Sequence, residues 1–230
     1  MKYYIWFIFS FLSLTAAAQD VNLLVQKVKA KIEQVNDYEA AGVMKTNVSF
    51  LKVPVANVKV YFKKPNRVKI RNEKGISFVP KGAVSINLNN ILSGGKYTVL
   101  DAGADKVGGK AVRVVKLLPE DDNADIVLST IYIDETNLVI LKSRTTTRDN
   151  GSYELEMSYG RYIAYGLPDK IIFSFNTKEY KLPKGITFDF DEGGQEAPKA
   201  EDKLKNKKGR AEISIKSYSI NKGVADAMFQ

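Results

Sequence analysis

Residues 126–177 decide the fold, and they read IVLSTIYIDETNLVILKSRTTTRDNGSYELEMSYGRYIAYGLPDKIIFSFNT. Within them Tyr153, Leu155 and Met157 alternate with polar residues, which is the period of a strand with one covered face. The pair Asn150-Gly151 predicts a hairpin turn, because glycine reaches positive φ without steric cost. Connections this short join antiparallel neighbours only. The pattern therefore predicts a meander of four strands, at residues 126–134, 138–147, 152–159 and 170–177.

One helix and several short strands precede the meander. Asp20 is placed to cap the helix, which we predict at residues 21–35. Its apolar stripe recurs at helical spacing and consists of Val21, Leu24, Val25, Val28, Ile32 and Val35. Residues 83–92 fit both helical and strand spacing, and we favour a short helix that ends at Gly94-Gly95. Alternation predicts strands at residues 42–50, 55–63, 67–71, 76–79, 97–101 and 111–118, with a glycine-rich turn at 103–109.

The segment after the meander is less regular. Residues 185–191 and 211–220 are predicted strands. Between them, residues 192–210 are rich in Gly, Pro, Lys and Glu without an apolar period, which predicts a flexible polar loop. Residues 222–229 are predicted to end the chain with a helical turn.

These elements predict an α+β fold, because the main helix precedes most of the strands and does not alternate with them. Many antiparallel strands in one sheet must twist and curl. We therefore expect a large curved antiparallel sheet that forms an incomplete β-barrel. The N-terminal amphipathic helix and one or two short helices would cover its mouth. Residues 19–230 would form a single domain.

Residues 1–18 have the composition of a secretory signal peptide. Lys2 supplies the charged start, an apolar run follows, and Ala16-Ala17-Ala18 is a small-residue cleavage site. The sequence therefore predicts export to the periplasm of a Gram-negative bacterium. The chain has no Cys, so the exported protein has neither a disulfide nor a thiol for lipidation. We expect a monomer.

The formal net charge is +9, which in a cytoplasmic protein would suggest nucleic acid as a partner. Export argues against that partner, and the Lys and Arg residues are spread over the polar faces of predicted strands. Attraction to anionic lipid surfaces is a weaker alternative.

The residue types limit the chemistry. Without His or Cys the chain has no histidine triad, no cysteine nucleophile and no ordinary zinc site. Asp121, Asn123 and Asp125 have the spacing of a calcium loop, but its Gly and its bidentate Glu are missing. Asp189, Asp191 and Glu192 fit a polar strand end. We expect no enzyme activity, no metal and no cofactor, and keep an enzyme using the acidic clusters as the weakest hypothesis.

Aromatic side chains are abundant in the predicted strands, and ordinary core packing accounts for most single positions. A curled sheet with one helix, however, does not easily fill its own concavity, so a partly open barrel suits a hydrophobic ligand. The residues expected to line this cavity are Val60, Phe62, Phe78, Tyr132, Tyr153, Leu155, Met157, Phe173 and Phe175. The face that each presents depends on register, because a slip of one residue reverses it.

Three stretches resemble the periplasmic outer-membrane lipoprotein carriers, the LolA/LolB-like family. They are the N-terminal helix followed by VKVYFKKPNRV at 58–68, the strand pair YIDETNLVILK at 132–142 with Gly151 and residues 162–168 after it, and the closing SINKGVADAMF at 219–229. The resemblance implies an incomplete barrel closed by helices, with a hydrophobic cavity for lipoprotein acyl chains. Its carriers have a lid-latching Arg where this chain has Lys64, and Lys lacks the planar fork of Arg.

The resemblance thus implies a soluble periplasmic carrier that binds acyl chains of lipoproteins, or other lipids, for outer-membrane sorting. Its partners would be an inner-membrane export complex and an outer-membrane acceptor. The alternative is a periplasmic sensor or regulatory binding protein of the same fold that acts through a protein partner.

Overall fold

The computed structural model describes residues 20–48, 51–52, 55–65, 67–72, 92, 96–149, 151–176 and 208–229. Its elements in chain order are α1 (Val21–Ile32), β1 (Asp37–Val48), β2 (Leu51–Lys52), β3 (Ala56–Lys63), β4 (Arg67–Asn72), β5 (Tyr97–Val107), β6 (Lys110–Pro119), β7 (Ile126–Asp134), β8 (Val139–Thr147), β9 (Gly151–Ser158), η2 (Ile163–Tyr165), β10 (Lys170–Asn176), β11 (Lys208–Ile220) and η3 (Asp226–Phe229).

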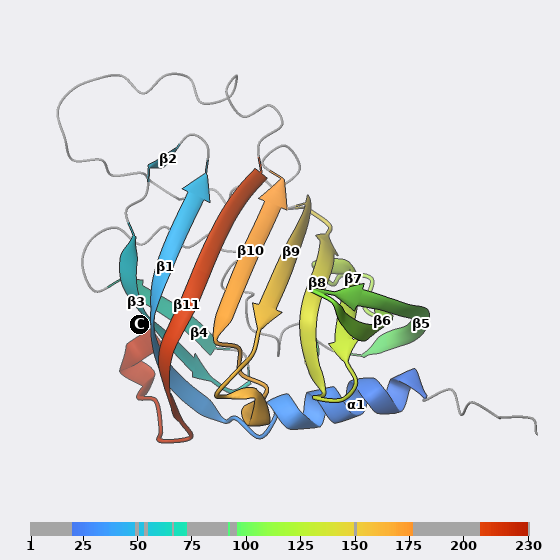
Figure 1. Cartoon of the computed structure of the whole chain (residues 1–230), viewed down its shortest axis with the longest axis horizontal. Coiled ribbons are helices and arrows are strands. Elements are labelled where there is room, and N and C mark those ends of the chain that lie inside the picture. The colour runs from blue at the N-terminus through green and yellow to red at the C-terminus, as the bar shows by residue number, and fades with distance from the viewer. Residues whose placement is uncertain are drawn as a thin grey trace, which may run out of the picture.

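All the strands in the described part of the chain belong to one antiparallel sheet of 11 strands, in the order β4-β3-β1-β11-β10-β9-β8-β7-β6-β5, with β2 paired to β1 off this path. Strands β9, β10, β11 and β1 face the viewer in Figure 1, and the two ends of the sheet curve away behind them. The strand order ends at β4 and β5, so the sheet is open. The predicted α+β fold with an incomplete barrel is therefore confirmed.

Helix α1 lies across one end of the curved sheet (Figure 1). The Asp20 carboxylate caps it by accepting from the backbone N of Asn22 at 2.8 Å. The predicted stripe faces inward, because Leu24, Val25, Val28 and Ile32 are buried against the apolar sides of β6, β7, β9 and β10. Among the described residues, none of the helices has the length and apolar character needed to cross a membrane.

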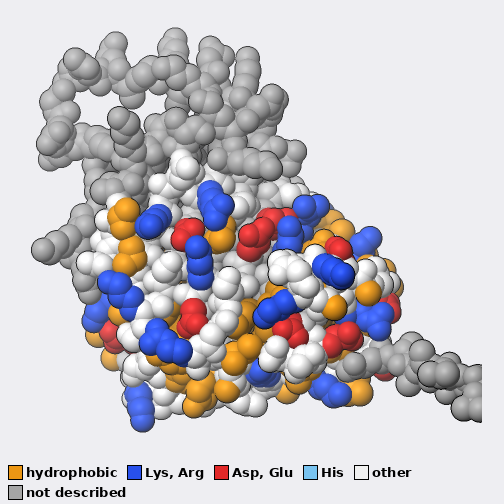
Figure 2. Space-filling model, in the orientation of Figure 1, with side chains coloured by type: hydrophobic (Ala, Val, Ile, Leu, Met, Phe, Trp, Pro, Cys, Tyr) orange, Lys and Arg blue, Asp and Glu red, His pale blue; other side chains and the backbone are white. Residues whose placement is uncertain are grey.

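The two faces of the sheet differ in chemistry. The concave face is mainly apolar, as the predicted alternation of β3 and β9 required, and its buried hydroxyls of Ser129 and Thr145 bond to each other. The convex face carries charges of both signs over β1, β11, β10, β9 and β8 (Figure 2). Cross-strand ion pairs join Lys142 to Glu154 at 2.9 Å and Lys170 to Glu212 at 2.8 Å.

Several predicted boundaries are wrong, each for a local physical reason. The strand predicted at 97–101 continues to Val107, because the sheet absorbs Gly103 as a bulge and only Gly108-Gly109 form the turn. Strand β1 begins at Asp37 instead of 42, and β11 begins at Lys208, within the predicted loop 192–210.

Other predicted elements follow the structure closely. The four-strand meander is present, and the tail forms η3. The predicted strands at 76–79 and 185–191 lie outside the described residues, as does the segment 83–92 except for Leu92, which is helical and buried.

Close packing at the β1–β11 pair predicts the effect of one substitution. A Cβ added at Gly42 would lie 2.6 Å from the carbonyl oxygen of Ser214, where β11 has a bulge. We expect Gly42→Ala to lower the free energy of unfolding by about 1–3 kcal/mol, because the backbone atom cannot yield. Urea unfolding would measure this. Ala41→Ser, the neighbouring change, serves as the control, and equal stability of both variants would contradict the prediction.

The convex ion pairs predict how stability depends on pH. The hydrogen bond from Lys170 lowers the pKa of Glu212, and this effect outweighs that of burial. A lowered folded pKa stabilises the fold above the unfolded value of about 4.3, and this contribution disappears as the pH falls through the folded value.

We therefore expect Glu212→Gln to lower the melting temperature at pH 7. Between pH 5 and pH 3, the melting temperature of this variant should fall by less than that of the wild type. Glu120→Gln, at an exposed loop position, should follow the wild type. Thermal unfolding across this pH range would test both, and parallel curves for Glu212→Gln and wild type would refute the assignment.

Candidate functional site

The candidate site is an apolar cavity on the concave face of β4, β3, β1, β11 and β10. Cross-strand pairing assembles it, because Ala40 pairs with Val60 and with Tyr218, and Val60 pairs with Ile70. The pair Ile171 and Ile213 extends the same surface onto β10. Its lining residues are Tyr38, Ala40, Val60, Val68, Ile70, Ile171, Ile213, Ile215 and Tyr218.

Among the described residues no charged side chain lines this cavity, and its two phenols are neutral. Burial raises the pKa of Tyr38 and that of Tyr218 above their ordinary range, so neither ionises at physiological pH. The Tyr218 hydroxyl donates to the carbonyl oxygen of Pro168 at 2.7 Å, which leaves its ring facing the cavity. The surface therefore offers contact to apolar groups and no ionic partner.

The cavity is narrow in this structure. Its volume is about 20 Å³, little more than the space that one water requires. Several lining side chains are nevertheless only half-buried, among them Tyr38, Val68, Ile70 and Ile171. An apolar ligand would have to widen the cavity by moving such side chains.

Helix α1 does not pack against this cavity. Its buried side chains belong to a separate cluster with Val115, Ile131, Leu155 and Phe173 on the other half of the sheet. The concave face thus has one half occupied by α1 and another half lined by β4, β3, β1, β11 and β10.

The structure brings only some of the predicted lining residues together. Val60 lies in the cavity. Five others share the concave face but pack in the cluster beneath α1, namely Tyr153, Leu155, Met157, Phe173 and Phe175. Phe62 is buried at one end of the sheet against Val35 and Leu167, and Phe78 lies outside the described residues.

Tyr132 is on the convex face. It packs with Val112, Val139 and Leu141, whereas its neighbours Ile131 and Ile133 point into the concave cluster. The structure therefore separates Tyr132 from the other described residues of the predicted set except Met157, with which it lines a second pocket. The reason is the one-residue alternation of a strand, which sends adjacent side chains to opposite faces.

Most of the cavity residues were not predicted as site residues. The alternation of Val68 with Ile70 and of Ile213 with Ile215 was visible in the sequence. What the sequence did not display was that the first and last strands are neighbours, which is what brings Tyr38 and Tyr218 together, with ring centroids 5.2 Å apart.

Lys64 is placed at the end of α1. Its ammonium donates to Oδ1 of Asn36 at 3.0 Å and to the carbonyl oxygen of Glu33. Its backbone N donates to the Asn36 carbonyl at 2.9 Å. The turn after β3 is thereby attached to the C-terminal end of the helix, where a cation also meets the negative end of the helix dipole. A role as lid latch stays a prediction.

The acidic positions form turns. Asp121 accepts from the backbone N of Asn123 at 2.9 Å, and Asp125 is exposed. Within the described ranges, no group of three or more acidic side chains is arranged to hold a metal ion. Asp189, Asp191 and Glu192 lie outside those ranges.

Comparison of the sequence with protein-family models and with curated proteins found no match. Solved structures gave similar folds. A domain assigned to outer membrane lipoprotein-sorting proteins, from Vibrio parahaemolyticus, is 14% identical over 90% of this chain and 95% of that chain, with a TM-score of 0.55. A DUF1329 family protein from Desulfovibrio piger ATCC 29098 is 14% identical over 91% and 97%, with a TM-score of 0.56.

A LolA superfamily protein from Nitrosomonas europaea is 9% identical over 91% of this chain and 96% of that chain, with a TM-score of 0.55. The chain therefore has a LolA-like fold over nearly its whole length, which confirms at the level of fold the resemblance seen in the sequence. At these identities the likeness establishes the fold alone.

The Lys64 contacts predict a measurable role in holding α1. We expect Lys64→Met to lower the free energy of unfolding by about 1 kcal/mol, because two hydrogen bonds from an ammonium to the helix end are lost. Amide hydrogen exchange should become faster at Gln34 and Val35, which bond back to the last turn of α1. Lys27→Met, on the exposed side of α1, is the control, and unchanged exchange at Gln34 and Val35 would contradict the role.

Proposed function

We propose that this protein is a soluble periplasmic carrier that binds the acyl chains of lipoproteins, or other lipids, in the concave cavity for outer-membrane sorting. The observation that carries the proposal is the cavity's lining, which is entirely apolar or phenolic yet partly open. A half-open surface of this kind stabilises an apolar ligand by removing it from water.

The free energy gained by burying an acyl chain can offset the cost of widening the cavity. Burial is worth about 0.8 kcal/mol for each CH₂, so a chain of about twelve methylenes would gain about 10 kcal/mol before costs. Separating side chains around a cavity of about 20 Å³ consumes part of this gain, together with the entropy of ordering the ligand. The net binding free energy would then be moderate, so that the ligand could be released, as a carrier requires.

Two further observations support the proposal. The fold is shared with a domain assigned to outer membrane lipoprotein-sorting proteins and with a LolA superfamily protein. The sequence begins with the signal-peptide pattern of residues 1–18, and a carrier between the two membranes would need export.

In this proposal the protein catalyses no reaction. Binding and release involve burial alone, so no side chain serves as nucleophile, acid or base. The protein would take its cargo from an inner-membrane complex and deliver it to an outer-membrane acceptor, as a monomer without metal or cofactor.

A matched pair of substitutions on β10 tests the cavity directly. Ile171 lines the cavity, while Ile172 is adjacent and pairs with Glu156 and Glu212 on the convex face. Both isoleucines are half-buried. Ile171→Lys should weaken binding of a fluorescent diacyl phospholipid by about tenfold or more, because a cation replaces apolar contact. Ile172→Lys should bind as the wild type does.

Circular dichroism and thermal unfolding would establish that both variants fold. Equal phospholipid affinity of two folded variants would rule out this cavity as the acyl site. If neither variant nor the wild type takes up the probe, the carrier proposal fails.

The cargo itself is identified by mass spectrometry of what stays bound to protein purified from its native source. Acylated proteins or peptides would establish lipoprotein carriage, and free lipid would establish a lipid carrier. An empty protein that also takes up no acyl probe would favour the sensor or regulatory protein, which acts through a protein partner.

A further inference from the structure

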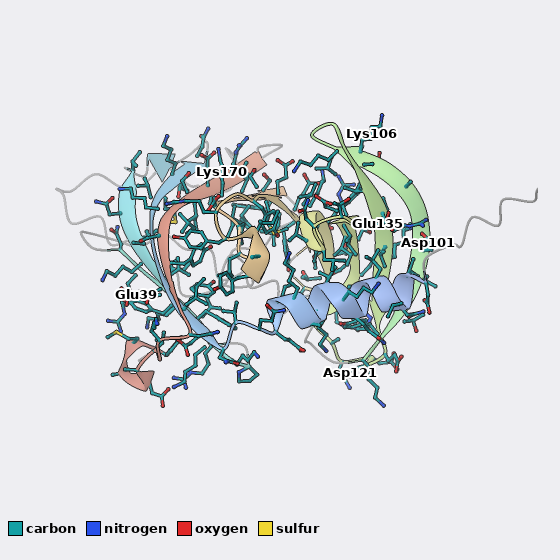
Figure 3. All side chains as sticks on the ribbon, turned by 60° about the horizontal axis from the view of Figure 1, so that its bottom comes forward. Glu39, Asp101, Lys106, Asp121, Glu135 and Lys170 are labelled. Carbon is teal, nitrogen blue, oxygen red and sulfur yellow. The ribbon has the colours of Figure 1, made fainter. Side chains whose placement is uncertain are left out.

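A second and larger pocket lies on the convex face, under the hairpin of β5 and β6. Figure 3 shows Lys106 at the turn of this hairpin, on the outer side of the molecule, while Asp101 lies farther back along β5. The hairpin closes over β7, β8 and β9, because Val107 and Val112 pack with Tyr132 and Leu141. The pocket is a half-open groove beside this contact.

The pocket differs from the concave cavity in size and in chemistry. Its volume is about 580 Å³, within the range of small-molecule sites. Its walls combine apolar side chains with charged ones, whereas the concave cavity has none that is charged. The two sites therefore suit different ligands.

Apolar and aromatic side chains form one part of the pocket wall. Val107, Tyr132, Leu141 and Tyr159 all line it. The Tyr159 hydroxyl donates to the carbonyl oxygen of Ile140 at 2.9 Å, which fixes the ring. Burial raises the pKa of Tyr159, so this wall carries no negative charge at physiological pH.

The acidic side chains of the pocket already have partners. Glu156 lies 3.9 Å from the ammonium of Lys142, which also meets Glu154 at 2.9 Å. The carboxylate of Asp105 accepts from the backbone N of Lys106 at 2.7 Å. Glu156 and Lys142 are thus ion-paired, whereas Asp105 is bonded to a neutral backbone group and keeps its negative charge at the hairpin.

Two ammonium groups at the hairpin form no close ion pair with a described residue. Lys106 and Lys110 are exposed and line the pocket, and across the described part of the chain no carboxylate lies within 4.0 Å of either. The charge of Lys110 helps to lower the pKa of Asp134 without forming an ion pair with it, and the Asp134 carboxylate accepts a hydrogen bond from Asn137 at 2.8 Å. With two ammonium groups and the carboxylate of Asp105, the rim has a net positive charge that an anionic ligand can meet.

We propose that this pocket binds a small amphipathic organic anion, with a planar or apolar body against Tyr132 and Leu141 and its carboxylate, phosphate or sulfonate at Lys106 and Lys110. The match of shape and charge carries the proposal. Aromatic walls favour a flat apolar body, and an anion at two unpaired ammonium groups gains attraction without displacing an existing ion pair. The site is separate from the acyl cavity, and its occupation does not depend on the proposed carrier function.

Chemical-shift mapping on the ¹⁵N-labelled protein tests the location, with 2-naphthylacetate as the probe. We expect the largest amide shifts at Asp105–Lys110 and at Glu156–Tyr159. Shifts confined to the concave residues, such as Ala40, Val60 and Ile213, would place the probe in the acyl cavity and overturn the proposal. The absence of any saturable shift would overturn it as well.

A charge comparison tests the chemistry. The double variant Lys106→Gln/Lys110→Gln should bind 2-naphthylacetate about fivefold more weakly, and the difference should shrink at high salt. The neutral analogue 2-naphthaleneethanol should bind both proteins equally. Lys116→Gln on β6, which is exposed and outside the pocket, is the matched control. An unchanged affinity of the double variant for the anion would refute the assigned role of the two lysines.

Discussion

The pairing of β1 with β11 is the contact on which the rest of the structure depends. It joins the first strand of the chain to the last and so connects β4, β3 and β1 to the meander. The Asn221 side chain secures it at one end by accepting from the backbone N of Asn36 at 2.7 Å and donating to the Gln34 carbonyl at 3.0 Å. Without this pair the concave cavity would not exist, because Tyr38 and Ala40 would not meet Ile213 and Tyr218.

The length of α1, the one α-helix whose bounds lie within the described residues, explains why the concave face has two parts. Helix α1 is 12 residues long, so it spans about 18 Å and covers the strands on one side only. There Leu24 and Val28 are fully buried and the cluster contributes stability. On the other side Val68, Ile70 and Ile171 stay half-buried, and they leave an apolar surface that α1 does not cover.

Sequence reasoning identified the parts of this structure that depend on local patterns. The stripe of α1 and the alternation of β3 and β9 each repeat within a few residues, so their buried faces were predictable. The cavity was not predictable, because Ala40 and Ile215 are 175 positions apart in the sequence. Local periodicity does not indicate which distant strands will pair. Leu141 shows a different limit: the register shift at Tyr132/Ile133 skips it between Lys142 and Ile140 and leaves it beside Tyr132 on the convex face. Bulges of this kind are set by the whole sheet.

The separation of charge from apolar surface also fixes the register on which both sites depend. On β9 and β10, a slip by one residue would turn Glu154 and Glu156 inward and expose Leu155 and Phe173 to water. Burying carboxylates away from Lys142 would cost several kcal/mol for each ion. The same alternation therefore keeps the described lining of the concave cavity free of charge and supplies the ion pairs beside the convex pocket. The register of β9 and β10 is therefore held by two opposite preferences, since the apolar residues are stable only on the concave face and the carboxylates only on the convex face.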